Sequence, residues 1–370
     1  MRESLPDERR SGVSERGKDN MKILVYGAGP LGSIFAAHLT WAGHDVSILA
    51  RNQRLRDLNE HGIVLEDHVS GERTTTRVNV VEALGKDDYY DMVMIIMRKN
   101  QAEDLLPILA ANERVPTYLF MMNNAAGPDA WVEALGKERV MMGFPLPGGE
   151  RDGHAIRIVT TDEKNRWPLP IGEVDGRVTD RTRRVAKALR KLPAYKVQVR
   201  RDMDRWLKHH VALIMPAMCP AMYAAGTDLQ RMARTRDALV LAVRGMREAI
   251  LALRRAGYPE SPAALRILHW IPEPILVWGF RRLMKTDMMK TVGEGHAKAA
   301  RDEMKHLADE FLAITRGAGV ETPICDELYS YYDPKTPEIT DGRRDIALRW
   351  TGLWAPIAAV AVAISAMALI

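Results

Sequence analysis

The feature that most constrains this 370-residue chain is a glycine-rich loop between an apolar run and an amphipathic segment. Residues 23–26 predict a strand buried on both faces, and a helical pattern follows the loop and closes at Gly43. A second predicted strand, 45–49, completes a βαβ unit. Glycines at this spacing allow a tight turn and close approach to a pyrophosphate at a helix N-terminus. The sequence therefore predicts a dinucleotide-binding loop formed by Gly27, Ala28, Gly29, Pro30, Leu31 and Gly32.

The end of the second strand indicates which dinucleotide to expect. NAD-binding proteins place Asp or Glu there to hold the ribose 2′-hydroxyl. Here the strand ends in Leu49-Ala50-Arg51, and Asp45 stands at its beginning, too far from the ribose. The Arg51 guanidinium could bind a 2′-phosphate, although it could also be an ordinary surface arginine. We expect NADP(H) as the cofactor.

The order of patterns predicts two domains, as the chain length also favours. Strand patterns at 91–97, 117–122, 140–144, 167–174 and 195–199 alternate with helical ones, and only helical patterns follow from about 203 to 332. The predicted fold class is α/β: a Rossmann-type domain over 21–199, then an all-helical domain over 200–335. Residues 1–20 are polar and predict a disordered tail, with Met21 a second candidate for the natural start.

The C-terminal segment 345–370 stands apart in composition. Residues 353–370 carry no charge, and as a helix they would extend about 27 Å, close to the thickness of a bilayer core. Arg343, Arg344 and Arg349 precede them, which would keep the main body cytoplasmic. The segment predicts either a membrane anchor or a helix buried at an oligomer interface. The Trp- and Pro-rich stretch 270–278 similarly predicts a pocket lid, core, or a membrane-facing surface.

Several classes of function are disfavoured. The net charge is only +5 and no Lys/Arg run stands out, so nucleic acid is not an expected partner. Cys219 and Cys325 are too few for a zinc site or a disulfide framework and predict buried thiols in a reducing compartment. Glu303 and His306 have the spacing of half a di-iron motif, but the other half is missing, so we expect no metal.

Several motifs resemble the ketopantoate reductase (2-dehydropantoate 2-reductase) family. They are the βαβ unit from Met21, DMVMIIMRKNQ, MNNAAG, IGEVDG, DRWLK and GAGVETP, and they span most of residues 21–335. The resemblance implies a Rossmann domain followed by a helical domain of the 6-phosphogluconate dehydrogenase C-terminal type. It also implies NADPH and a small 2-keto acid bound between the domains, and a homodimer.

The resemblance further implies roles for individual residues. Lys208, in Trp-x-Lys, would polarise the substrate carbonyl and donate a proton, although a solvated helix lysine would show the same pattern. Glu303 would hydrogen-bond the substrate, and Thr291 would contact its carboxylate. Asn124 would lie near the nicotinamide, and Arg98 stands where the family has a cofactor-site lysine.

Two positions depart from the family. Four and eight residues after its lysine the family has asparagines, whereas this chain has Ala212 and Pro216. Neither side chain can form a hydrogen bond, so substrate orientation must differ. We therefore expect an NADPH-dependent reductase of a 2-keto acid or related carbonyl other than ketopantoate. The alternative is a non-catalytic NADP(H)-binding sensor or scaffold tethered at a membrane.

Overall fold

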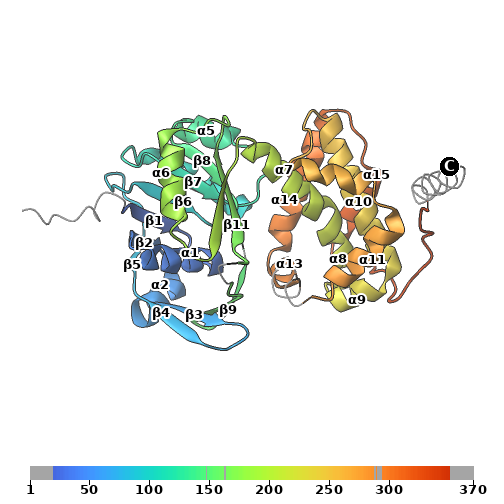
Figure 1. Ribbon diagram of the computed structural model, residues 1–370, viewed down its shortest axis with the longest axis horizontal. Helices are drawn as coiled ribbons and strands as arrows, with labels where there is room; N and C mark the ends of the chain where they lie inside the picture. Colours follow the sequence, from blue (N-terminus) through green and yellow to red (C-terminus); the bar gives the residue numbers. More distant parts are fainter. Residues whose placement is uncertain (1–19, 147, 162–163, 287–288, 290–293, 351–370) are drawn as a thin grey trace, which may run out of the picture.

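The computed structural model describes residues 20–146, 148–161, 164–286, 289 and 294–350. A sheet-containing part extends to the end of strand β12 (Tyr195–Val199), and a helical part begins with α7 (Met203–Leu213). The two parts stand side by side and α7 joins them (Figure 1). The predicted fold class, a Rossmann-type domain followed by an all-helical one, is confirmed.

The main sheet has eight strands in the order β12-β11-β8-β7-β6-β1-β2-β5. The central pairs are parallel, and only the β8–β11 pair is antiparallel. The strands not yet given are β1 (Lys22–Tyr26), β2 (Asp45–Leu49), β5 (Asn79–Val81), β6 (Met92–Ile95), β7 (Tyr118–Met121), β8 (Val140–Gly143) and β11 (Trp167–Glu173). The strands predicted from apolar runs lie where expected, to within two residues at each end.

Alternate residues of the central strands enter two different cores. Ile23 and Val25 pack beneath α1 (Pro30–Trp41) and α6 (Asp180–Leu189), whereas Leu24 and Tyr26 face the opposite side. That side is covered by α3 (Lys99–Ala102), the 3-10 turn Glu103–Leu105, α4 (Leu106–Ala111) and α5 (Asp129–Leu135). Burial on both faces explains the continuous apolar runs of the parallel strands.

A second sheet was not predicted. It has four strands in the order β4-β3-β10-β9. Their bounds are β3 (Ile63–Asp67), β4 (Arg73–Thr76), β9 (Gly149–Asp152) and β10 (Ala155–Ile158). The strands β4 and β9 are mostly exposed, so they carry no run of apolar residues. Helix α2 (Asn52–His61) leads from β2 into this sheet.

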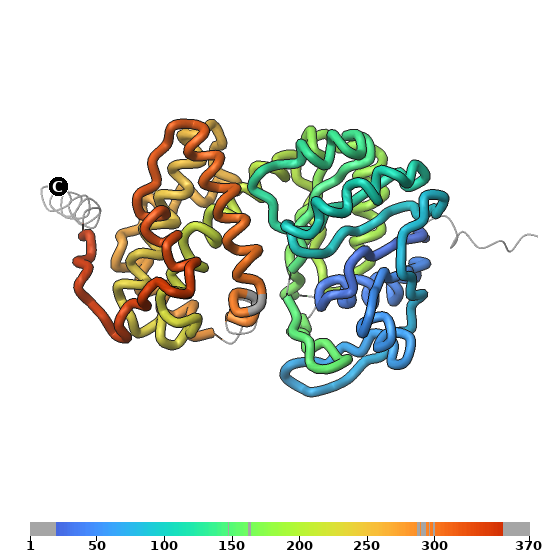
Figure 2. Tube along the Cα trace, turned by 180° about the vertical axis from the view of Figure 1, so that it is seen from behind, coloured from blue at the N-terminus to red at the C-terminus, as the bar shows by residue number. Residues whose placement is uncertain are grey.

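The helical part is built around α10 (Arg236–Arg255), whose buried residues share one core with most of its other helices. These helices are α8 (Cys219–Ala224), α9 (Leu229–Arg234), the 3-10 helix Ala263–His269, α11 (Glu273–Leu283), α13 (Gly295–Ala299), α14 (Arg301–Gly317), α15 (Pro323–Tyr329) and the turn Ser330–Tyr332. Seen from behind, the segment that contains α14 borders the sheet part (Figure 2). Cys219 and Cys325 are buried free thiols, as expected.

Between α7 and α8 the helix widens into a π-helical stretch, Ile214–Met218. Pro216 lies at its centre, and a proline cannot donate the backbone hydrogen bond that an α-helix requires there. Ala212 and Pro216 are both buried. Ala212 and Pro216, the positions where the family resemblance implies asparagines, are therefore apolar. Pro216 also lies within the π-helical stretch.

Three predictions fall outside the described residues: the tail 1–19, the substrate contact Thr291, and the apolar segment 353–370. Among the residues that the structure describes, no helix is both long and apolar enough to cross a bilayer.

Candidate active site

The glycine loop is fixed by contacts that exclude a side chain. Gly27 has φ +121°, and a Cβ there would collide with the carbonyl oxygen of Ile96. A Cβ at Gly32 would collide with the carbonyl oxygen of Gly27, whereas one at Gly29 would meet nothing within 4 Å. Pro30 begins α1, so the N-terminus of α1 faces the loop. This backbone cradle fits the pyrophosphate of a dinucleotide.

A cavity of about 410 Å³ opens beside this loop at the carboxyl ends of β1, β2 and β6. Arg51, Arg54 and Arg151 line it together with Asp104. Arg51 is exposed at the start of α2 and donates to the Tyr26 hydroxyl at 3.3 Å. Its guanidinium therefore lies at the end of β2, beside the cavity and the glycine loop.

Sequence reasoning missed Arg54 and Arg151, which both reach the loop. Arg54 is buried and donates to the Ala28 carbonyl at 3.2 Å and to Ser33 Oγ at 3.0 Å. Burial, and next the charge of Arg151, lower the pKa of Arg54 to about 10. Arg151 donates to the same Ala28 carbonyl at 3.1 Å from β9, in the unpredicted sheet. The loop therefore lies in a more positive environment than Arg51 alone would give.

Lys208 is buried at the junction of the two parts. Its ammonium donates to Asp204 Oδ1 at 2.5 Å, one helical turn earlier, and lies 5.2 Å from the centre of the Tyr258 ring. Asp204 was not predicted. An opposite charge and an aromatic ring thus face the buried ammonium. Lys208 is therefore not the solvated helix lysine that was the alternative.

Asn124 lies in the turn that follows β7 and closes that turn. Its side-chain amide donates to the Gly127 carbonyl at 2.8 Å, and its oxygen accepts from the Gly127 N–H at 3.1 Å. Asn124 is fully buried, and Gly127 lies directly beside the Lys208 ammonium. Asn124 and Lys208 therefore contact the same turn at Gly127.

Glu303, in the first turn of α14, reaches across the junction. Its Oε1 accepts from the backbone N–H of Lys99 at 3.2 Å. Burial raises the pKa of Glu303 to about 7, against the opposing effects of the Lys99 hydrogen bond and the Arg98 charge. Burial thus makes the protonated form of this carboxyl easier to reach than that of an exposed glutamate.

Arg98 also lies at the junction, in contact with α14. Its guanidinium lies 3.3 Å from Asp302 Oδ1, and Asn100 donates to the other Asp302 oxygen at 3.0 Å. The prediction that Arg98 contacts the cofactor is not tested by these contacts. They show that the loop after β6 is bound to α14.

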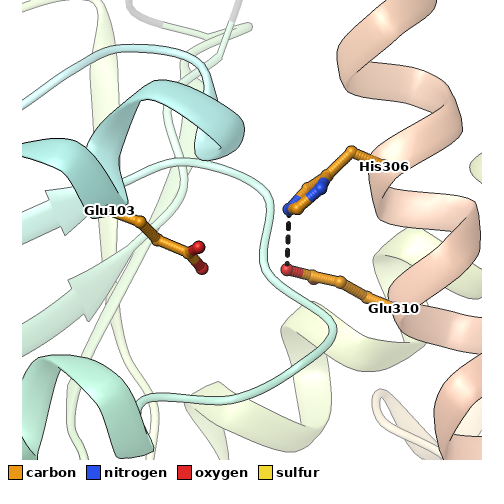
Figure 3. A group of neighbouring side chains, drawn as sticks. All are labelled: Glu103, His306 and Glu310. Atoms are coloured by element: carbon orange, nitrogen blue, oxygen red, sulfur yellow. Dashed lines mark ion pairs between the residues drawn. The ribbon is translucent and has the colours of Figure 1, made fainter.

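The next residue, Lys99, was overlooked because one lysine in a polar stretch gives no signal. It is buried, and its ammonium lies 2.5 Å from Glu103 Oε1, 3.2 Å from Glu310 Oε1 and 5.5 Å from the Trp131 ring. Figure 3 shows Glu103 reaching from the sheet part toward Glu310 and His306 on α14. Two carboxylates and an imidazole this close could hold a metal ion. The Lys99 ammonium already contacts both carboxylates, so the cluster gives no support for one.

Glu310 connects this cluster to the nicotinamide turn. Its second oxygen accepts from the backbone N–H groups of Ala125 and Ala126 at 2.8 and 3.0 Å. One side chain of α14 thereby binds the loop after β6 through Lys99 and the turn after β7. The predicted residues Lys208, Asn124 and Glu303 are linked by this series of contacts.

Comparison with known proteins supports the family resemblance and the fold. Residues 23–166 match the family described as Ketopantoate reductase PanE/ApbA. A 2-dehydropantoate 2-reductase of Listeria monocytogenes is 23% identical over 158 residues, 42% of this chain and 53% of the relative. The chain spans about half the length of the curated 2-dehydropantoate 2-reductases that it matches, 49–58%.

Solved structures extend the likeness to the helical part. A D-mandelate dehydrogenase bound to NADH and anilino(oxo)acetate has a TM-score of 0.68 at 14% identity, covering 84% of this chain and 97% of that one. A 2-dehydropantoate 2-reductase of Geobacter metallireducens has a TM-score of 0.68 at 16% identity, covering 85% and 99%. The resemblance to the ketopantoate reductase family, whose members are oxidoreductases acting on CH–OH groups, is confirmed by the sequence of residues 23–166 and by the fold of both parts.

Proposed function

We propose that this protein is an NADPH-dependent reductase of a small 2-keto acid or related carbonyl compound, with a substrate other than ketopantoate. One observation carries the proposal. A buried lysine ammonium, Lys208, lies against the Asn124–Gly127 turn at the carboxyl end of β7, on the edge of the sheet where the glycine loop also lies. Ligands of open parallel sheets bind at that edge.

The choice of NADPH rests on charge. Arg51, Arg54 and Arg151 surround the cavity beside the glycine loop, and the end of β2 offers no carboxylate for a ribose hydroxyl. Arg54 and Arg151 already bind the Ala28 carbonyl, so Arg51 is the residue we assign to the 2′-phosphate. When bound, NADPH would supply the hydride that reduces the carbonyl carbon.

Lys208 would supply the proton. Its ammonium would donate a hydrogen bond to the carbonyl oxygen, polarise the carbonyl, and transfer a proton as the alcohol forms. Asp204 holds the ammonium toward the Gly127 turn. Solvent would then return a proton to the amine.

Glu303 and the apolar positions would select the substrate. A carboxyl with a pKa near 7 can take up a proton and donate to a substrate carboxylate instead of repelling it. Ala212 and Pro216 remove two hydrogen-bonding side chains that the family resemblance implies, which favours a less polar substrate. The substrate class therefore remains a 2-keto acid, with an apolar group in place of a hydroxylated one.

The test is NADPH oxidation by the full chain against a panel of 2-keto acids with apolar and polar side chains. Lys208→Ala should lower kcat by about 10²- to 10⁴-fold while NADPH binding persists. Lys305→Ala, an exposed lysine paired with Asp309 on α14, is the matched control and should retain turnover. Tight NADPH binding without turnover of any panel member would instead support the non-catalytic sensor.

A further inference from the structure

Exposed apolar side chains concentrate on one face of the helical part. Of the nine large apolar side chains that the described residues expose, four lie within residues 267–278 and a fifth is Trp350. Trp270 is 81% exposed and Trp278 57%. The set, called the tryptophan face below, is Ile267, Trp270, Ile275, Trp278 and Trp350. Such a concentration on a folded protein marks an interaction surface.

Buried polar contacts hold the tryptophan face in place. Glu273, the first residue of α11, is buried and accepts two hydrogen bonds from Arg244 at 2.9 Å. It also accepts from the backbone N–H of Arg349 at 2.9 Å, which fixes Trp350 beside the start of α11. Arg247 donates to the carbonyls of Leu268 and Ile271, on either side of Trp270. These contacts fix the backbone segments on which Trp270, Trp278 and Trp350 are exposed.

The surroundings of the tryptophan face are basic. Arg281, Arg282 and Lys285 follow Trp278, whereas Arg266 pairs with Glu260 at 3.0 Å and Glu273 is buried against Arg244. Ile275, Trp278 and Arg282 share one side of α11, and the Arg282 guanidinium lies 4.5 Å from the Trp278 ring. Tryptophans next to basic side chains are typical of segments that lie in the interface of a bilayer.

A cavity of about 650 Å³ adjoins this face. Arg244, Arg247, Arg255 and Arg349 line it with His269, the neighbour of Trp270. Three carboxylates line it as well: Glu273 pairs with Arg244, Glu248 accepts from the backbone N–H groups of Ile324 and Cys325, and Glu321 is the third. Four arginines against three glutamates leave one net positive charge, which suits a phosphate group. The chain then continues from Trp350 into the uncharged residues 353–370.

We propose that the tryptophan face docks this protein on an anionic phospholipid bilayer. The tryptophans and isoleucines enter the headgroup region, the flanking arginines bind lipid phosphates, and the arginine-lined cavity accepts one headgroup. α11 lies at the end of the helical part away from the sheet, so docking leaves the candidate active site open to solvent (Figure 1). The interaction is independent of the proposed reductase activity.

The test places a fluorescent probe on the full chain. Because Cys219 and Cys325 are buried, a thiol-reactive, polarity-sensitive dye would label Trp270→Cys selectively. Val69→Cys is the matched control, since Val69 is 88% exposed in the turn between β3 and β4. On adding vesicles of phosphatidylcholine and phosphatidylglycerol, emission from position 270 should shift to shorter wavelength, while emission from position 69 stays unchanged.

A second measurement tests the role of charge. Arg281→Gln/Arg282→Gln should weaken binding to these vesicles roughly thirty-fold, because each basic side chain near an anionic surface strengthens binding roughly fivefold. Pure phosphatidylcholine vesicles should bind the unmodified chain far less. The proposal is overturned if the dye at position 270 is already blue-shifted without lipid. If that blue shift grows with protein concentration, a second copy of the chain covers the tryptophan face. If it does not change with protein concentration, residues 353–370 of the same chain cover it.

Discussion

The glycine loop and the Lys208 junction lie at the same edge of the sheet but are held together differently. The loop is constrained by its own backbone, since Gly27 and Gly32 are in contact and both belong to one βαβ unit. The junction is assembled from four distant segments: the loops after β6 and β7, α7 and α14. The hydrogen bond from Lys99 to Glu303 spans 204 residues of sequence.

The glycine loop and the junction should therefore differ in how many amino-acid substitutions they tolerate. A backbone cradle tolerates almost no substitution, because any Cβ at Gly27 or Gly32 meets a carbonyl oxygen. The junction depends on side-chain pairs such as Lys99–Glu310 and Lys208–Asp204, which can be replaced pair by pair. A chain of this fold can therefore keep its cofactor while its substrate changes.

The largest expected effect is a difference in stability between alanine substitutions at two glycines of the same loop. Gly32→Ala forces a Cβ onto the Gly27 carbonyl and should lower the free energy of unfolding by about 4 kcal/mol or more. Gly29→Ala meets no neighbour and should leave the stability of the cofactor-free protein nearly unchanged, yet weaken NADPH binding by blocking the pyrophosphate. Urea denaturation and NADPH titration of both variants measure this. Equal destabilisation by the two would contradict the backbone argument.

On the junction side, Glu303 should make stability depend on pH. Its pKa rises from 4.5 to about 7 on folding, so the folded protein binds the proton more tightly than the unfolded chain. This contribution is fully present below about pH 4.5 and is lost as pH rises through about 7. The total loss is on the order of 3 kcal/mol.

Glu303→Gln keeps an oxygen for the Lys99 N–H but cannot titrate. Its stability relative to the unsubstituted protein should therefore increase by about 3 kcal/mol between pH 4.5 and pH 8, measured by urea denaturation. The exposed Glu327→Gln on α15 provides the matched control. Parallel pH profiles for Glu303→Gln and the unsubstituted protein would show that Glu303 is ionised throughout this range.

The contrast between the two regions also explains what sequence analysis could predict. The central strands could be predicted because their apolar runs are buried on both faces of the sheet. Helix α1 and the glycine loop could be predicted from a helical pattern and a glycine spacing that lie within one βαβ unit. The β4-β3-β10-β9 sheet was missed because its outer strands are exposed and polar. Arg151, which lies on β9, was missed with it.

Within the junction, the resemblance implied roles for Lys208, Asn124 and Glu303 but did not point to the charged residues that contact them. Asp204, Lys99 and Glu310 are charged residues in helical or polar stretches, a setting in which most such residues are solvated. Lys99 and Glu310 meet only when α14 packs against the sheet part, whereas Asp204 pairs with Lys208 within α7. No local pattern distinguishes a buried ion pair of this kind from a surface one.

Glu310 gives a smaller and more local prediction. Its carboxylate accepts from the backbone N–H groups of Ala125 and Ala126, and a hydrogen bond to a charged group contributes about 1.5–3 kcal/mol. Glu310→Ala should therefore speed hydrogen exchange at these two amides by roughly tenfold or more and raise KM for NADPH. Asp309→Asn, which removes a carboxylate that contacts Lys305 and Tyr329 instead, should leave both amides protected. Unchanged exchange in Glu310→Ala would mean that Asn124 alone fixes the turn.

The smallest effect distinguishes the two nicotinamide cofactors. Arg51→Gln should weaken NADPH binding about tenfold, the loss of one charge-assisted contact to a 2′-phosphate, and leave NADH binding unchanged. Arg56→Gln, one turn along α2 and exposed, removes the same charge away from the cavity. If Arg51→Gln weakens both dinucleotides equally, Arg51 acts on the shared part of the cofactor. Arg54 and Arg151 would then determine any preference between NADPH and NADH. Because both donate to the Ala28 carbonyl, the choice of cofactor would depend on side chains that also hold the glycine loop.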